Sequence, residues 1–177
     1  YKSLCTQNLP DPTIADGSTA FDAVTYTGNG AARTISGLSM SPDLVWIKSR
    51  STTYFHFLVD IVRGANKELY SNDNNSEQQP GAGSVSAFNS DGFDLTSRAG
   101  VNNSSTTYVA WTWDGGTSTV SNTDGSITSS VRANTSAGFS IVTASPSNNA
   151  VSIGHGLNAA PSMIISKSRT VTYDWNV

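Results

Sequence analysis

Hydrophobic and polar residues alternate along much of this chain, in short runs that are separated by turn-forming residues. The clearest alternating runs are Phe21–Thr27, Leu44–Lys48 and Thr107–Trp113. A period of two residues places successive side chains on opposite faces of a β-strand, whereas a helix repeats about every 3.6 residues. The pattern therefore predicts an all-β protein that is built from short strands.

Turn residues between these runs locate the remaining strands. Further strands are predicted at Ala32–Ile35, Tyr54–Val62, Lys67–Ser71, Ser84–Asn89 and Phe93–Leu95. Gly28-Asn29-Gly30 is typical of a hairpin turn, so Ala32–Ile35 is expected to pair back on Phe21–Thr27. Strands at intervals of roughly 8–12 residues indicate an antiparallel β-sandwich, of the jelly-roll or concanavalin-like kind.

The strand pattern occurs twice. Phe21-Asp-Ala-Val-Thr25 recurs 118 residues later as Phe139-Ser-Ile-Val-Thr143. Later features recur at an offset of 119 residues: Gly37-Leu38 as Gly156-Leu157, Pro42 as Pro161, Lys48 as Lys167, Arg50 as Arg169 and Tyr54 as Tyr173. One residue is therefore inserted in the second copy, between Val142 and Gly156. Self-similarity of this kind indicates tandem modules.

The repeat divides the chain into four parts. Residues 1–20 are interpreted as the end of a preceding domain, and residues 21–116 as one complete β-sandwich repeat. Residues 117–138 form a linker with short strands and a turn at Thr123-Asp124-Gly125. Residues 139–177 are a truncated second repeat. Because the chain begins with Tyr1 and ends within a strand-like pattern, we expect both ends to be cuts from a longer polypeptide.

Composition excludes several classes of function. Only 13% of the residues are charged, and Ser, Thr, Asn and Gly make up 78 of the 177 residues. The net charge is −3 with no basic run, which argues against nucleic-acid binding. No apolar stretch approaches the ~20 residues of a membrane helix, so no membrane insertion is expected. The single cysteine, Cys5, excludes an internal disulfide framework and a cysteine-based zinc site.

Signs of catalysis are weak. The chain has two histidines, and His56 lies among aromatic residues in a predicted strand, where a half-buried structural histidine is the simpler interpretation. His155 lies in a Gly-His-Gly turn and is matched by Ser36 in the first copy. Most of the thirteen acidic residues lie in turn contexts, and Asp16, Asp91, Asp114 and Asp124 directly precede glycine, where a carboxylate accepts hydrogen bonds from its own backbone. We therefore expect a protein that is not an enzyme.

Aromatic residues are the main candidates for ligand binding, because Trp and Tyr faces pack against the C–H groups of sugars. The candidate glycan-binding residues are Trp113, Trp46, Trp111 and Asp114. Val109, Trp111 and Trp113 share one face of a predicted strand, and the first interpretation of that face is the sandwich core. A glycan platform is the alternative. Trp113 is the best candidate for exposure, since it ends the strand next to Asp114.

One loop concentrates oxygen-bearing side chains of the kind that Ca²⁺ binds. Asp73, Asn75 and Glu77 are the candidate ligands, although the loop lacks the glycine and the final glutamate of an EF-hand. A flexible, solvated loop is the alternative interpretation. Apart from this calcium candidate, no cofactor is expected.

Several motifs together resemble a family of phage tail-fibre and virion structural proteins. The opening Tyr1–Pro10, with its Leu9-Pro10-Asp11-Pro12 exit, resembles the end of a SPRY-like (concanavalin-type) domain. The segments that resemble the tandem modules that follow such domains are Tyr26-Thr-Gly-Asn-Gly30, Pro42-Asp-Leu-Val-Trp-Ile-Lys48, Asp60-Ile-Val-Arg-Gly64, Ser90-Asp-Gly-Phe93, Tyr108-Val-Ala-Trp-Thr-Trp113 and the spacer Val120–Asn134.

This resemblance implies a location in the virion, outside the cell, and no catalytic residues. It implies other virion subunits as partners, in a homotrimer, and attachment to a host surface glycan. Two alternatives remain open from the sequence. One is a purely structural module that spaces a fibre or decorates a capsid, and the other is a bacterial surface adhesin.

Overall fold

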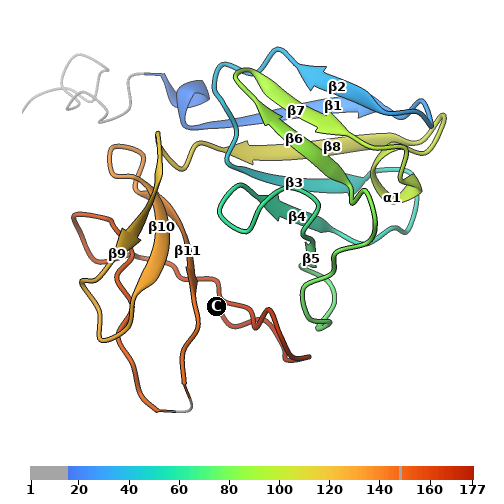
Figure 1. Ribbon diagram of the computed structural model, residues 1–177. Helices are drawn as coiled ribbons and strands as arrows, with labels where there is room; N and C mark the ends of the chain where they lie inside the picture. Colours follow the sequence, from blue (N-terminus) through green and yellow to red (C-terminus); the bar gives the residue numbers. More distant parts are fainter. Residues whose placement is uncertain (1–15, 148) are drawn as a thin grey trace, which may run out of the picture.

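The computed structural model describes residues 16–147 and 149–177 (Figure 1). The residues interpreted as the end of a preceding SPRY-like domain, including Cys5, lie almost entirely outside the described residues. In chain order the elements are η2 (Gly17–Thr19), β1 (Phe21–Thr27), β2 (Arg33–Ser36), β3 (Leu44–Ser49), β4 (Phe57–Asp60), β5 (Leu69–Tyr70), β6 (Val85–Asn89), β7 (Gly92–Leu95), α1 (Ala99–Asn102), β8 (Thr107–Trp113), β9 (Thr119–Asn122), β10 (Ser129–Asn134) and β11 (Phe139–Ala144).

Two antiparallel sheets within residues 21–113 face each other and form a sandwich. One sheet has five strands in the order β1-β8-β3-β4-β5, and the other has three in the order β2-β7-β6. Both contribute to one core, in which Val45, Ile47 and Tyr108 from the first sheet pack with Phe93 and Leu95 from the second. The all-β, antiparallel sandwich predicted from the alternating pattern is therefore confirmed.

The predicted hairpin between Phe21–Thr27 and Ala32–Ile35 is wrong. β1 pairs with β8, and β2 pairs with β7 in the opposite sheet. The turn glycines bind a distant loop instead, because the backbone N–H of Gly28 donates to Thr106 and that of Gly30 donates to Asn102. These bonds direct the chain across the edge of the sandwich, so β1 and β2 belong to different layers.

A third antiparallel sheet, in the order β11-β10-β9, lies beside the sandwich (Figure 1). It joins strands from the predicted linker to the first strand of the predicted second repeat. An ion pair between Arg132 on β10 and Asp43, with 2.8 Å between nitrogen and oxygen, connects this sheet to the sandwich. Among the described residues no helix is long and apolar enough to cross a membrane.

The C-terminal residues 163–177 run back along the sandwich near β5. Both Arg169 guanidinium contacts to the Glu77 carboxylate measure 2.9 Å. The indole N–H of Trp175 donates to the backbone carbonyls of Tyr70 and Asp73, at 2.9 and 3.0 Å. These contacts fasten the C-terminal segment to the loop between β5 and β6.

Candidate functional site

The outer face of the five-stranded sheet carries the tryptophans of β8. Tyr108, Ala110 and Thr112 are fully buried and point into the core, whereas Trp111 and Trp113 are partly exposed on the opposite face. The first interpretation of the Val109, Trp111 and Trp113 face as the sandwich core is therefore wrong. Tyr108 can be buried in the core because its hydroxyl group has hydrogen-bond partners there: it donates to the Ala99 carbonyl and accepts from the Asn103 N–H.

The sheet register brings the three candidate tryptophans together. Trp46 on β3 lies opposite Trp111 on β8, and their ring centroids are 5.9 Å apart with an edge-to-face arrangement. The Trp46 and Trp113 rings are stacked at 6.4 Å. Phe21, which lies opposite Trp113 on β1, extends the group at 5.0 Å. We call Phe21, Trp46, Trp111 and Trp113 the aromatic platform.

Asp114 follows the platform directly but its carboxylate already has partners. One oxygen accepts from the Gly116 N–H at 2.6 Å, and the other accepts from the side-chain amide of Asn134 at 3.1 Å. The residue therefore shapes the turn after β8. A ligand that binds Asp114 would therefore have to donate to a carboxylate oxygen that already accepts one of these hydrogen bonds.

One edge of the platform is in contact with the third sheet. Phe139, the first residue of β11, stacks on Trp113 with 6.1 Å between ring centroids. The indole N–H of Trp46 is shielded from solvent and has no hydrogen-bond partner. A buried donor without a partner costs about 1–3 kcal/mol, and the structure offers no local compensation for it.

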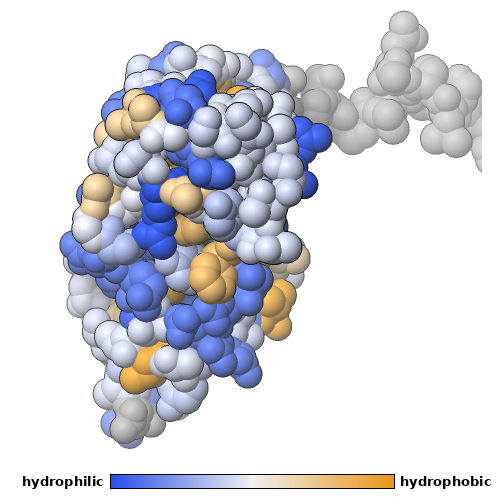
Figure 2. Space-filling model, turned by 90° about the vertical axis from the view of Figure 1, so that its right-hand side faces the viewer, coloured by the Kyte–Doolittle hydropathy of each residue, from blue (hydrophilic) through white to orange (hydrophobic). Residues whose placement is uncertain are grey.

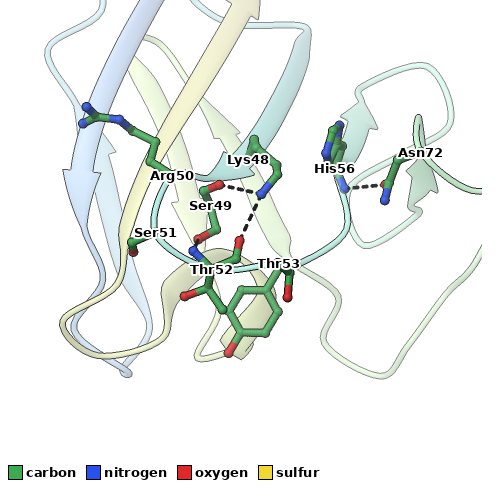
Figure 3. A pocket seen from close by; sticks show the side chains of 9 residues that line it. Lys48, Ser49, Arg50, Ser51, Thr52, Thr53, His56 and Asn72 are labelled. Carbon is green, nitrogen blue, oxygen red and sulfur yellow. Dashed lines mark hydrogen bonds between the residues drawn. The ribbon is translucent and has the colours of Figure 1, made fainter.

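A polar hollow adjoins the platform along β3. Lys48 lies on the same outer face as Trp46, two residues further along the strand, and it lines an open hollow of about 420 Å³ with residues 49–54, His56 and Asn72 (Figure 3). None of these lining residues is acidic, and Lys48 and Arg50 carry positive charge. Such a hollow suits a carboxylate, sulfate or phosphate group.

Lys48 is held in place by backbone carbonyls. Its ammonium group donates to Ser49 at 2.5 Å and to Thr52 at 3.1 Å, as the dashed lines in Figure 3 show. Partial burial, and then the nearby charge of Lys48, lower the pKa of His56. Sequence reasoning missed this hollow. In the sequence, Lys48 and Arg50 stand out only because they recur as Lys167 and Arg169, and that recurrence does not indicate a binding role.

The candidate calcium ligands are engaged within the protein. Glu77 is ion-paired with Arg63 at 3.3 Å and with Arg169 at 2.9 Å. The Asp73 carboxylate accepts from the Asn74 backbone and from the Asn75 side chain. Within residues 16–147 and 149–177, no three His, Cys, Asp or Glu side chains are grouped so that they could hold a metal ion. Calcium binding stays a prediction, and these contacts do not favour it.

A second group of charged residues is buried at the edge of the core. Glu68 is fully buried, accepts from the Tyr70 hydroxyl at 2.9 Å and is ion-paired with Arg98 at 3.2 Å. Burial, and then the neighbouring Glu68, raise the pKa of Tyr70 to about 12. Glu68 lines neither the hollow beside Lys48 nor the one that Pro161–Ile164 and Val177 form.

The surface on the side of α1 and β5 is mostly polar. Figure 2 shows this side, where hydrophilic and neutral residues dominate and hydrophobic residues form small, separate patches.

Comparison with known proteins yields one match. No curated protein and no solved structure matches the chain at a significant level. A protein family does match, over residues 16–177, which is most of the chain and includes the sandwich, the third sheet and the C-terminal segment. The chain therefore belongs to the family described as "Domain of unknown function (DUF7483)".

Proposed function

We propose that this chain is a module of a virion fibre or spike that attaches to a glycan on the host cell surface. The virion location, the other virion subunits as partners and the homotrimer rest on the resemblance of the sequence motifs to phage tail-fibre proteins. The binding role rests on one observation, namely that Trp46, Trp111 and Trp113 gather on the outer face of one sheet.

Aromatic faces bind sugars because one side of a pyranose ring presents C–H groups that pack against an indole ring. A sugar on Trp111 and Trp46 would have Lys48 beside it, since Lys48 follows Trp46 on the same face of β3. The charges of Lys48 and Arg50 attract an anionic substituent. An acidic sugar, which carries a carboxylate, sulfate or phosphate, is therefore the ligand class that this surface fits best.

Binding to immobilised host envelope glycans tests the proposal, with the protein displayed multivalently so that weak single-site affinity is detectable. Trp111→Ala is expected to weaken binding by at least about tenfold, since removal of an aromatic contact costs about 1.4 kcal/mol or more. Tyr173→Ala is the matched control, because Tyr173 is 66% exposed and lies outside the platform.

Binding that Trp111→Ala leaves unchanged, in a variant with a wild-type unfolding curve, would contradict the platform as the site. Complete absence of binding to acidic and neutral host glycans would contradict attachment itself.

A structural role in the virion is the second candidate, and the stack of Phe139 on Trp113 favours it because that contact joins two sheets of the module. Particles that carry Trp111→Ala separate the two roles. Normal assembly with reduced adsorption to host cells supports attachment, whereas defective assembly with normal adsorption of the remaining particles supports a spacer or decoration module.

A further inference from the structure

The two tryptophans on β8 differ in how many aromatic rings surround them. Trp113 stacks on Trp46 at 6.4 Å and on Phe139 at 6.1 Å. The Phe21 ring also lies 5.0 Å from Trp113. Trp111 has one aromatic neighbour among the described residues, namely Trp46, which it meets edge to face at 5.9 Å. Fewer rings therefore compete with a ligand for Trp111, which makes it the better residue for stacking a sugar.

Short side chains lie beside Trp111 on the outer face of the sheet. On β1, Ala23 lies opposite Trp111 and Thr25 lies opposite Val109. Residues that are directly opposite in an antiparallel pair project from the same face. Ala23 and Thr25 are exposed, and Val109 is partly exposed. We call Ala23, Thr25 and Val109 the small-residue floor. Because these side chains are short, the floor leaves room above the sheet next to the Trp111 ring.

The small-residue floor leads from Trp111 toward the positive charge of Lys48. Lys48 on β3 lies opposite Val109. Its ammonium group lines the polar hollow, whose lining residues include no acidic side chain (Figure 3). Thr107 follows on the same face of β8, two residues beyond Val109. At about 3.4 Å per residue, Trp111 and Thr107 are about 14 Å apart along the strand, which is longer than one sugar ring.

We infer, on the basis of the proposed function, that the site binds a stretch of linked sugars and not a single sugar. One unit stacks on Trp111, and the next unit lies over the small-residue floor with its acidic group beside Lys48. The chain of sugars then continues along β8 toward Thr107. In the opposite direction it would meet the stack of Phe139 on Trp113, which joins the sandwich to the third sheet.

The polar groups along this path match the chemistry of an acidic oligosaccharide. The hydroxyl groups of Thr25 and Thr107 can each donate and accept a hydrogen bond, as the hydroxyl groups of a sugar do. The ammonium group of Lys48 attracts a carboxylate, sulfate or phosphate substituent. An aromatic ring at one end and a cation further along the strand also fix the direction of the bound chain, because the two ends of the site bind different groups.

Inhibition of binding to immobilised host envelope glycan tests the inference. The inhibitors are fragments of that glycan, separated by size into one, two and four sugar units and by anion exchange into acidic and neutral fractions. We expect acidic four-unit fragments to inhibit at least about tenfold more strongly than either single sugars or neutral four-unit fragments, a difference of about 1.4 kcal/mol. Mass spectrometry of the inhibiting fraction then distinguishes carboxylate, sulfate and phosphate.

Two variants locate the path of the bound sugars. Thr25→Phe is expected to weaken inhibition by the four-unit fragments at least about tenfold, because a large ring fills the space above the small-residue floor. Thr119→Phe is its matched control, since Thr119 is an exposed threonine in β9. Lys48→Gln is expected to remove the preference for acidic fragments. Lys167→Gln is its control, because the Lys167 ammonium group also donates to the carbonyl of the next residue, at 3.1 Å.

The outcomes separate this inference from the proposed function. Equal inhibition by single sugars and four-unit fragments would overturn the inference and leave host attachment intact. The same holds for full inhibition of a Thr25→Phe variant with a wild-type unfolding curve, and for an acid preference that persists in Lys48→Gln. Absence of any binding to host glycans by the unmodified protein would contradict the proposed function and the inference together.

Discussion

The ion pair between Asp43 and Arg132 lends itself to a quantitative test of how the third sheet is held to the sandwich. Asp43 is fully buried and its second carboxylate oxygen accepts from the Gly115 N–H at 2.8 Å. The Arg132 side chain is 13% exposed, and its Nε lies 2.8 Å from the other oxygen without hydrogen-bond alignment. The contact is therefore mainly electrostatic. We predict that Asp43→Asn keeps the shape of the site and removes this attraction.

The size of the effect follows from the environment of the two charges. At an effective dielectric constant of about 20, unit charges at this separation attract by roughly 6 kcal/mol, and most of that offsets their desolvation. Burial of Asp43 raises its pKa in spite of the ion pair, which is in line with a large desolvation cost. Removal of one partner leaves the other charge buried, at a cost of about 3 kcal/mol. The unfolding equilibrium constant should rise by more than about 100-fold.

Urea denaturation, followed by tryptophan fluorescence, measures this change for Asp43→Asn, Arg132→Met and the double variant. Each single substitution should cost about 3 kcal/mol, and the double substitution should cost less than their sum because it leaves no unpaired charge. A lower denaturant dependence in Asp43→Asn would indicate that the third sheet has separated from the sandwich. A cost below about 0.5 kcal/mol, or strict additivity, would refute the electrostatic account.

Two further predictions concern the C-terminal segment and the first turn. Burial opposes ionisation of Glu77, but its guanidinium partners outweigh burial and hold its pKa below the ordinary 4.5. Its contribution to stability is therefore complete above about pH 4.5 and is lost as the pH falls through the lowered pKa, so Glu77→Gln should flatten the pH dependence of urea unfolding below about pH 4.5. Gly28→Ala should destabilise the fold by about 3 kcal/mol in thermal unfolding, since a Cβ would overlap the Asn103 carbonyl oxygen, whereas Gly17→Ala, with no atom nearby, should be near neutral.

The limits of β1, β3 and β8 could be predicted closely from the sequence. Phe21–Thr27 and Thr107–Trp113 are strands over the predicted residues, and Leu44–Lys48 differs from β3 by one residue. Tyr54–Val62 is shorter in the structure, where only Phe57–Asp60 is a strand. Local alternation and turn residues determine where a strand begins and ends, so these features are available without a fold.

Strand pairing could not be predicted in the same way. The first strand pairs with β8, so that Phe21 lies opposite Trp113, more than 90 residues away in the chain. A hairpin signal such as Gly28-Asn29-Gly30 is local, whereas the hydrogen bonds that these glycines make go to residues 102–106. Long-range contacts override a local turn preference when they satisfy more backbone groups and bury more apolar surface.

The sequence by itself determined that this protein is made of short antiparallel strands, that its pattern occurs twice, and that three of its four tryptophans lie in two of those strands. Only the tertiary structure decided which face of β8 is buried, because Tyr108-Ala110-Thr112 and Val109-Trp111-Trp113 are both apolar enough to line a core. Packing against the second sheet selected the first set, and register then placed Trp46 beside Trp111 and Trp113. Alternation defines two faces of a strand, but the layer that covers one of them decides which face remains for binding.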